Sequence, residues 1–562
     1  MKRFIISIIL LTLLITVPCW GATHYISEST GAESAQNGES SAAPWQQLDH
    51  IEDHGWASGD KVLLMCGDTW SKSAGDWGSV GDRIYITNET NLTIGAYYLD
   101  GATPREVDGV TYKCSDDSTV DPIIDGNVSS GWGTSTYDAI LWVDSGTTGL
   151  VIQDVQLKNY YRGVSIRQIT SESTAISDIT IQRCNFDNFG LGWIYIEPQP
   201  TGTDYPYDNI SDITIQDNTM TKAQLSYPEG ASGWGNCIKI YTADNVIVRR
   251  NIMGQCSGEL VNFKMEADDG ECYDNIGWDV DGGTFKVVNS DNVSVHHNFA
   301  IHTGDATYSY RSRAGLTMSS ESDDYTVASA AVTDPSNNKF YSNVVAGYMI
   351  GIWINDGQDD ADSGSATNYV YNNTFIDCGN GASLHGGTYR LPTPGDVLEF
   401  EVEIANNLSV INDITNGEHY AYADVNSNIT FAGNGWDESD PTDTSYCTSS
   451  DCDDGTDVTG DPDLVDPAAC GTSWRGCAAY DTPLPGDAAL GASSDFIGVG
   501  ADLGLGSSYL GLNPNSEWVD DVNTLNQDTY TPWEMGAYVY TAPGPVVPTY
   551  PLQGAAGNFK YN

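Results

Sequence analysis

Basic residues are scarce in this chain of 562 residues, because 23 Lys and Arg stand against 77 Asp and Glu and give a net charge of −54. Such an acidic surface excludes general binding to nucleic acids and to anionic membranes. After the N-terminal segment, no apolar run approaches the roughly 20 residues of a transmembrane helix, so we expect no membrane insertion. Paired CxxC zinc spacing, a phosphate-binding glycine loop and a convincing Ser-His-Asp set are also missing.

Helical periodicity is missing as well. Apolar residues alternate with polar ones over short stretches, which is the period of a strand and not the 3.6-residue period of a helix. The 59 glycines and the many Asn, Asp, Ser and Thr residues suit frequent turns between these stretches. The composition therefore predicts an all-β protein with many short strands.

The one long apolar run is Phe4–Val17, which follows Lys2 and Arg3 and precedes Cys19-Trp20-Gly21. This pattern predicts a secretory signal over residues 1–21 and a secreted, extracellular or cell-surface protein. Export permits disulfides among the 12 cysteines. Cys447/Cys452 and Cys470/Cys477 are close enough in sequence to form local pairs. For Cys237, Cys256 and Cys272, burial as small apolar side chains is the alternative reading.

From about residue 137 to residue 436, apolar alternations repeatedly close on Asn. The closing residues are Asn185, Asn218, Asn251, Asn275, Asn298, Asn343, Asn373, Asn407 and Asn434. Their smallest separation, from Asn275 to Asn298, indicates one rung of three short strands and three turns, with loops inserted in the longer intervals. Stacked rungs would align these Asn side chains at one turn, each amide capping a neighbouring rung.

These Asn-closed rungs resemble the right-handed parallel β-helix of the pectate-lyase-like superfamily, in its secreted bacterial form. The opening around HYIS and GDKVLLMCGDTW and the closing Gly536-Ala537-Tyr538 resemble the first and last segments of such proteins. The resemblance implies a solenoid with an N-terminal cap over 22–136 and central rungs over 137–436. Loop-rich C-terminal rungs and a cap would follow over 437–541, with a flexible tail over 542–562. It implies no particular activity, because the fold hosts many.

Alternation along three consecutive rungs assigns side chains to the inside or the outside. In CIKIYT, ELVNFKME and TFKVV the large apolar residues point inward, so Lys239, Lys264 and Lys286 point outward on one face. Eight of the 23 basic residues lie between residues 222 and 313. A cationic face on a chain of this charge favours an anionic ligand.

An anionic polysaccharide is therefore the expected partner, and we expect a monomer. We predict a lyase that cleaves a uronate-containing glycan by β-elimination, in which a base removes the proton α to a neutralised carboxylate. The predicted catalytic residues are Lys264, Lys286, Lys239 and Arg313. The predicted substrate-binding residues are Tyr241, Asn262, Arg311, Trp353, His385 and Tyr195.

The segment Glu259-Leu-Val-Asn-Phe-Lys264 resembles the E-x-x-x-x-K element of the alginate lyase/chondroitinase B family. That resemblance implies that Lys264 is the base and that Glu259 is a Ca²⁺ ligand. The sequence departs from this pattern at Ser257, where a second acidic ligand is expected. The family's downstream catalytic arginine also has no clean match, so Lys286, Arg311 or Arg313 would have to replace it. Nearby carboxylates complete the predicted Ca²⁺ site, which consists of Glu259, Glu266, Asp268 and Asp269.

Two other functions fit the same pattern. A non-catalytic surface protein or adhesin could bind glycans through the same face. A glycoside hydrolase would need paired carboxylates, for which Asp279 with Asp281, or the group Asp356, Asp359 and Asp360, are candidates.

Overall fold

The computed structural model describes residues 21–538 with gaps. The gaps are 33–37, 77–82, 118, 129–138, 169–173, 199–203, 206–208, 224–235, 304–313, 322–325, 328–329, 332, 357–366, 379–386, 393–397, 399, 411–419, 422–427, 438–456, 465–487, 501–509, 513–523 and 527–534. The predicted signal, apart from Gly21, and the predicted tail lie outside the described residues, as do Cys447, Cys452, Cys470 and Cys477.

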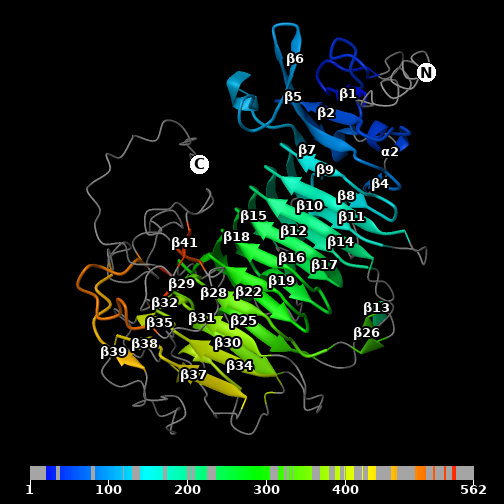
Figure 1. Cartoon of the computed structure of the whole chain (residues 1–562). Coiled ribbons are helices and arrows are strands. Elements are labelled where there is room, and N and C mark those ends of the chain that lie inside the picture. Colours follow the sequence, from blue (N-terminus) through cyan, green and yellow to red (C-terminus); the bar gives the residue numbers. More distant parts are fainter. Residues whose placement is uncertain are drawn as a thin grey trace, which may run out of the picture.

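The predicted parallel β-helix is confirmed. Strands stack in parallel from the blue β1 (Thr23–Ile26) to the yellow β37 (Ile429–Ala432) and form three long sheets (Figure 1). One rung consists of β17 (Ala243–Arg249), β18 (Ile252–Cys256) and β19 (Glu259–Lys264), and β20 (Glu271–Tyr273) begins the next. β10 (Gln156–Ile166) and β12 (Asn185–Ile196) run through the second and third sheets without interruption.

The first sheet also contains β1 (Thr23–Ile26), β2 (Lys61–Met65), β5 (Thr93–Asp100), β9 (Val151–Gln153), β11 (Ile176–Gln182), β14 (Ile210–Gln216), β23 (Ser294–His296), β28 (Lys339–Tyr341), β31 (Asn368–Tyr371), β34 (Val402–Ala405) and β37 (Ile429–Ala432). The second sheet also contains β3 (Thr69–Ser71), β7 (Ile123–Asp125), β15 (Thr219–Ala223), β21 (Ile276–Val280), β24 (Phe299–Ile301), β29 (Val344–Ala346), β32 (Thr374–Ile376), β35 (Leu408–Val410), β38 (Gly435–Trp436) and β39 (Val458–Thr459). The third sheet also contains β4 (Ile84–Ile86), β8 (Ala139–Val143), β16 (Asn236–Tyr241), β22 (Gly283–Val288), β25 (Ala314–Ser320), β30 (Ile350–Asp356), β33 (Gly387–Arg390) and β36 (Tyr420–Ala421).

Smaller elements lie outside these sheets or at their edges. They are α2 (His50–Asp53), η1 (Lys72–Ala74), β6 (Thr103–Glu106), η2 (Cys114–Asp117), β13 (Asp204–Tyr205), β26 (Thr326–Val327), β27 (Ala330–Ala331), β40 (Leu510–Leu512) and β41 (Thr524–Asn526). Among the described residues, no helix is both long enough and apolar enough to cross a membrane.

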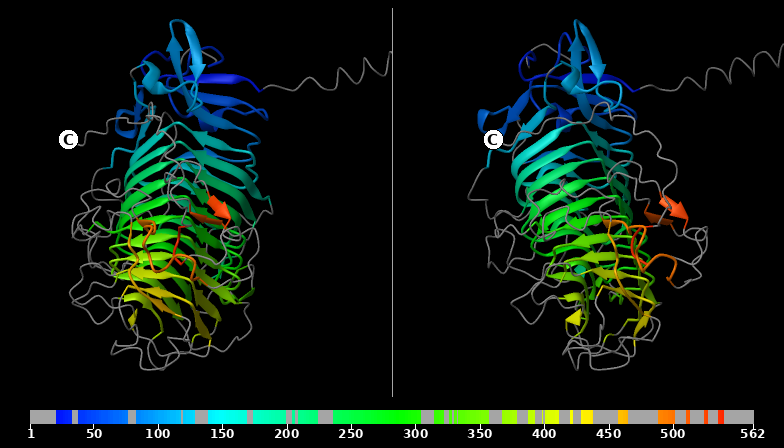
Figure 2. Two further views of the ribbon diagram at one scale, coloured as in Figure 1. Left: turned by 60° about the vertical axis from the view of Figure 1, so that its left-hand side comes forward. Right: turned by 90° about the vertical axis from the view of Figure 1, so that its left-hand side faces the viewer.

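The core runs along the axis of the solenoid. The residues predicted to point inward, including Ile238, Val261 and Phe285, belong to one continuous apolar cluster and are fully buried. Each rung contacts its neighbours through these side chains and through backbone hydrogen bonds, so the core grows by repetition. Figure 2 shows the stack from two further sides.

An Asn ladder follows the turn between the first and second sheets. Asn275 is representative: its Oδ1 accepts from the backbone N and Nδ2 of Asn251, both at 3.0 Å, and its Nδ2 donates to Asn298 Oδ1 at 3.0 Å and to Val248 O at 2.9 Å. The residue before each ladder position adopts a positive φ, as Asp274 does at 56°. Each amide thus satisfies backbone groups that the bend removes from the sheets.

The ladder differs from the prediction at its first position. Cys184 occupies that place, and its backbone N donates to Asn218 Oδ1 at 2.9 Å. Asn185 is the next residue and begins β12. The sequence marker misplaced this position by one residue, because Cys and Asn are adjacent at the end of that alternation.

Two disulfides join described cysteines, Cys66 with Cys114 and Cys237 with Cys256. The second one shows that Cys237 and Cys256 are bonded and are not merely small buried residues. Cys272 is a buried free thiol, as the burial reading expected. Burial raises the pKa of the Cys184 thiol to about 12, so this second free cysteine stays protonated.

The C-terminal segment packs along the outside of the solenoid. Residues 488–490, 496, 512 and 535–538 form a second apolar cluster with outward side chains of the second sheet, including Trp278 and Leu408. Ala537, in the predicted closing motif, donates its backbone N–H to Thr374 Oγ1 at 2.9 Å. The outer face of the second sheet is therefore covered over several rungs. The predicted lysines lie on the third sheet.

Candidate functional site

Two rows of outward side chains run along the third sheet, as the strand register shows. One row places Tyr195, Lys239, Asn262, Lys286, Thr317, Trp353 and Arg390 beside one another on successive strands. The other row, two residues further along each strand, includes the neighbours Tyr241 and Lys264. Adjacent members lie about 4.8 Å apart, the spacing between paired strands.

The register corrects the predicted row of three lysines. Lys239 and Lys286 share one row, with Asn262 between them, whereas Lys264 lies in the other row beside Tyr241. All three point outward, as the alternation predicted. They are not an open row of ammonium groups, because 15%, 10% and 9% of the side chains of Lys239, Lys264 and Lys286 are exposed.

Three cations converge on one carboxylate at the N-terminal part of this face. Lys239 pairs with Glu197 Oε2, while Nη1 of Arg162 and Nη1 of Arg167 lie 3.5 and 3.7 Å from Glu197 Oε1. All four side chains are largely buried. The guanidinium of Arg162 also lies over the ring of Tyr195, 3.9 Å from its centre. This cluster, here called the Glu197 cluster, holds more positive than negative charge.

Burial and charge shift the pKa values of the Glu197 cluster. Burial lowers the pKa of Lys239 below its usual value, and Arg162 and Arg167 lower it further, against the opposing effect of Glu197. Burial would raise the pKa of Glu197, but the three cations outweigh it and hold that pKa below its usual value. A lysine with a lowered pKa next to a surplus of cations is suited to accept a proton beside a bound anion.

A second cluster lies further along the same face, and in it the charges balance. Lys286 Nζ donates to Glu259 Oε1 at 2.6 Å and to Glu321 Oε1 at 3.5 Å, and Lys264 Nζ pairs with Glu321 Oε2. Burial lowers the pKa of Lys286, but the two carboxylates outweigh it and raise the pKa above its usual value. Lys286 is therefore a cation at neutral pH and a poor base.

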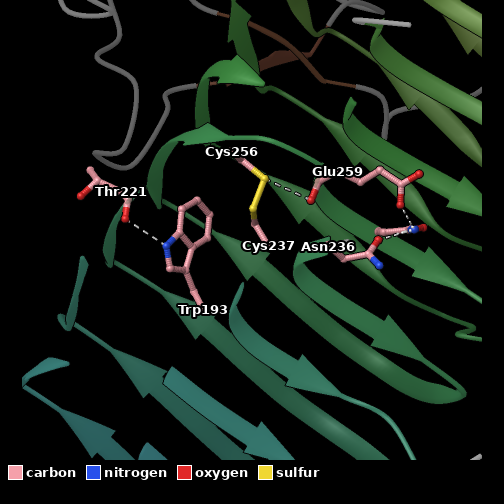
Figure 3. Close-up of a disulfide and its surroundings, with 7 residues drawn as sticks. Trp193, Thr221, Asn236, Cys237, Cys256 and Glu259 are labelled. Atoms are coloured by element: carbon pink, nitrogen blue, oxygen red, sulfur yellow. Dashed lines mark hydrogen bonds between the residues drawn. A yellow bond between two sulfur atoms is a disulfide. The ribbon is translucent and has the colours of Figure 1, made fainter. Parts of the chain in front are cut away.

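Glu259 is fixed by its own strand and by its neighbours. Its Oε2 accepts from Asn262 Nδ2 at 2.6 Å, and that amide also donates to Asn236 Oδ1 at 2.7 Å. Figure 3 shows the Cys237–Cys256 disulfide beside this group, with Cys256 Sγ 3.5 Å from the backbone O of Glu259. The disulfide joins β18 of the second sheet to β16 of the third.

The predicted calcium ligands do not come together as a set. Both carboxylate oxygens of Glu259 are bound by Lys286 and Asn262. Glu266 accepts from the backbone N of Thr333 at 2.5 Å, and Asp268 accepts from that of Asp291 at 2.7 Å. No group of three or more potential metal ligands occurs within the described part of the chain. Calcium binding therefore stays a prediction.

The other predicted residues are distributed as follows. Tyr241 lies under Lys239, whose Nζ is 3.9 Å from the centre of the ring. Trp353 is on the same face, three strands after Asn262, with the guanidinium of Arg390 4.5 Å from its ring. Arg311, Arg313 and His385 lie outside the described residues, so their roles stay predictions.

Sequence reasoning missed three charged groups of this face. Arg167 could have been found by aligning the strands, because its backbone N bonds Val143 O in the same way that Glu197 N bonds Ile166 O. Arg162 follows an irregularity in the pairing of β10 with β12, which alternation does not reveal. Glu321 follows β25 and reaches Lys264, 57 residues earlier in the chain, which has no local signal.

No protein-family model and no curated protein sequence matches this chain. Solved structures match this chain at low sequence identity and low TM-score. A mannuronic acid specific polysaccharide family 6 lyase from human gut microbiota is 13% identical over 74% of this chain and 88% of its own, with a TM-score of 0.41. The GH136 lacto-N-biosidase from Eubacterium ramulus is 11% identical over 73% and 68%, with a TM-score of 0.37. The tailspike of E. coli bacteriophage HK620, in complex with a pentasaccharide, is 10% identical over 75% and 77%, with a TM-score of 0.37.

Proposed function

We propose that this protein is a polysaccharide lyase that cleaves a uronate-containing glycan by β-elimination on the outer face of the third sheet. The observation that carries the proposal is the convergence of Arg162, Arg167 and Lys239 on the single carboxylate of Glu197. Three cationic side chains that converge on one carboxylate, on a chain of charge −54, favour an anionic ligand at that place. The aromatic rings of Tyr195 and Tyr241 beside it supply apolar surface for a sugar ring.

In the proposed reaction, Arg162 and Arg167 neutralise the uronate carboxylate, which makes the adjacent C5 proton acidic. The neutral amine of Lys239 takes that proton, the C4–C5 double bond forms, and the C4–O bond to the neighbouring sugar breaks. The ammonium of Lys239 then returns the proton to the leaving oxygen. We assign the base to Lys239 because its amine lies in the Glu197 cluster with the two arginines that would hold the carboxylate, where burial lowers the pKa of Lys239.

The second cluster supports binding in the same proposal. Lys264 and Lys286 add two cations along the direction in which a linear polymer would follow the face. Because Glu259 and Glu321 raise the pKa of Lys286, this cluster also suits a second function, a protein that binds acidic glycans without cleaving them.

Incubation of the purified protein with alginate, polygalacturonate and chondroitin, monitored by the ultraviolet absorbance of the unsaturated uronate, tests the proposal. We expect the absorbance to rise with one of these glycans. In Lys239→Ala the rate of that rise should be about 10² to 10⁴-fold lower. Full activity of folded Lys239→Ala would refute the assigned base. Binding without new absorbance or reducing ends would identify the glycan-binding protein, and reducing ends without absorbance a hydrolase.

A further inference from the structure

Glu321 reaches back across the third sheet from the end of β25. One carboxylate oxygen pairs with Lys264 on β19, and the other lies 3.5 Å from Lys286 on β22. The two lysine side chains are 10% and 9% exposed, whereas that of Glu321 is 34% exposed. Among the three side chains, that of Glu321 is therefore the most accessible to solvent.

The backbone of Glu321 is held by a hydrogen bond, and its side chain pairs with Lys264 and Lys286. Its backbone N donates to Asn289 Oδ1 at 2.8 Å, and Asn289 Nδ2 donates to Thr333 O at 3.0 Å. Rotation about the side-chain bonds of Glu321 would break its ion pairs with Lys264 and Lys286 and leave these backbone contacts intact. Lys286 would keep its hydrogen bond to Glu259, so one cation of the pair stays fixed in place.

A carboxylate bridging two lysines on an outward face has the chemistry that a uronate carboxylate would present there. We propose that Glu321 is an internal mimic of a substrate carboxylate, occupying a second anion-binding position that a sugar carboxylate takes when Glu321 swings away. This inference rests on the proposed function, and it extends it by one carboxylate-binding position outside the Glu197 cluster. Displacing Glu321 then costs free energy and lowers the affinity for the glycan. Ligands with more than one carboxylate are favoured, because a second carboxylate can take the position that Glu321 leaves.

Chemical modification of lysines tests, without any glycan, whether Glu321 protects Lys264 and Lys286. Acetylation with an N-hydroxysuccinimide ester, followed residue by residue by mass spectrometry, should be faster at Lys264 in Glu321→Gln than in the wild type. Lys286 should gain less, because Glu259 still holds it. Lys61, whose partner is Glu106 at 2.7 Å, is the internal reference and should not change. Equal acetylation of Lys264 in the two proteins would overturn the proposal.

Binding of oligo-uronates, measured by calorimetry, tests the competition. We expect Glu321→Gln to bind a uronate hexamer about 3 to 10-fold more tightly than the wild type, since an exposed ion pair opposes binding only modestly. Glu321→Asp, which keeps the charge but shortens the reach, should also bind more tightly. Glu106→Gln, which removes a carboxylate far from this face, is the matched control and should bind as the wild type does. Unchanged or weaker binding by Glu321→Gln overturns the proposal.

Cleavage and binding separate this inference from the proposed function. Tighter binding by Glu321→Gln without any unsaturated product supports the second anion position and refutes the elimination. Cleavage with equal KM in wild type and Glu321→Gln refutes the second position and leaves the elimination standing. Failure of every acidic oligosaccharide to bind either protein refutes both.

Discussion

Lys286 and Glu259 form an ion pair with 2.6 Å between Nζ and Oε1, and more than nine-tenths of each side chain is buried. Removal of one partner leaves the other charge buried without its main counter-ion. We therefore expect Glu259→Gln to lower the free energy of unfolding by about 3 kcal/mol, as measured by urea denaturation.

The double variant Glu259→Leu, Lys286→Met should recover most of that loss, because neither charge then remains to be buried. Glu106→Gln breaks a pair whose side chains are 39% and 37% exposed, and it should cost less than about 1 kcal/mol. Equal losses in Glu259→Gln and Glu106→Gln would mean that burial does not set the strength of the Glu259 pair.

The pH dependence of cleavage should report Lys239. Its pKa is lowered by burial and by two arginines, and Glu197 opposes that shift. The rate should therefore rise with pH and reach its plateau below the usual range of lysine. Glu197→Gln removes the opposing carboxylate, so the rising limb should move to lower pH, provided that circular dichroism shows the variant to be folded.

A rising limb that stays in place or moves to higher pH in Glu197→Gln would contradict the role of Lys239. Glu106→Gln serves again as the control, because its partner Lys61 lies on β2 of the first sheet. The rising limb of this variant should coincide with that of the wild type.

Asp268 should make stability depend on pH. Burial and then neighbouring carboxylates raise its pKa from 3.8 to about 7, despite the hydrogen bond from the backbone N of Asp291. A raised pKa means that the folded state favours the protonated carboxyl. This contribution is fully present below about pH 4 and is lost as the pH rises through 7.

Asp268→Asn is neutral at every pH and keeps an oxygen for the Asp291 hydrogen bond. Its melting temperature should match the wild type at pH 4 and exceed it at pH 8. A substitution of the exposed Asp53 on α2 to Asn should leave the shape of the profile unchanged. A wild-type advantage at pH 8 would show that the charged form of Asp268 stabilises the fold.

Asn275 should be costly to replace, because it is fully buried and its amide bonds two neighbouring ladder residues and two backbone carbonyls. Asn275→Ala leaves those groups unsatisfied, and we expect a loss of about 3 kcal/mol in urea denaturation. Asn185→Ala is the matched control, since Asn185 stands beside the ladder and not in it. A similar small loss in both variants would mean that the ladder adds little to stability.

Part of this protein could be predicted because its signals are local. Alternation assigns Ile238 and Val261 to the core and Lys239 and Lys264 to the outside, whatever the register, since successive strand residues point to opposite faces. The repeated Asn marks one turn of each rung, and its αL neighbour explains why the chain bends there. These features determined the solenoid, its core and the face that carries the lysines.

The site itself required the tertiary structure. Which outward residues become neighbours depends on where each strand starts after a loop of variable length, so Lys264 falls beside Tyr241 and not in the row of Lys239 and Lys286. The partners of the three lysines are Glu197, Glu259 and Glu321, which lie 42, 27 and 57 residues from them. Whether a charge is neutralised depends on which oppositely charged group folding brings beside it. The sequence by itself therefore determined a cationic face, and only the three-dimensional arrangement decided which cations outnumber their carboxylates.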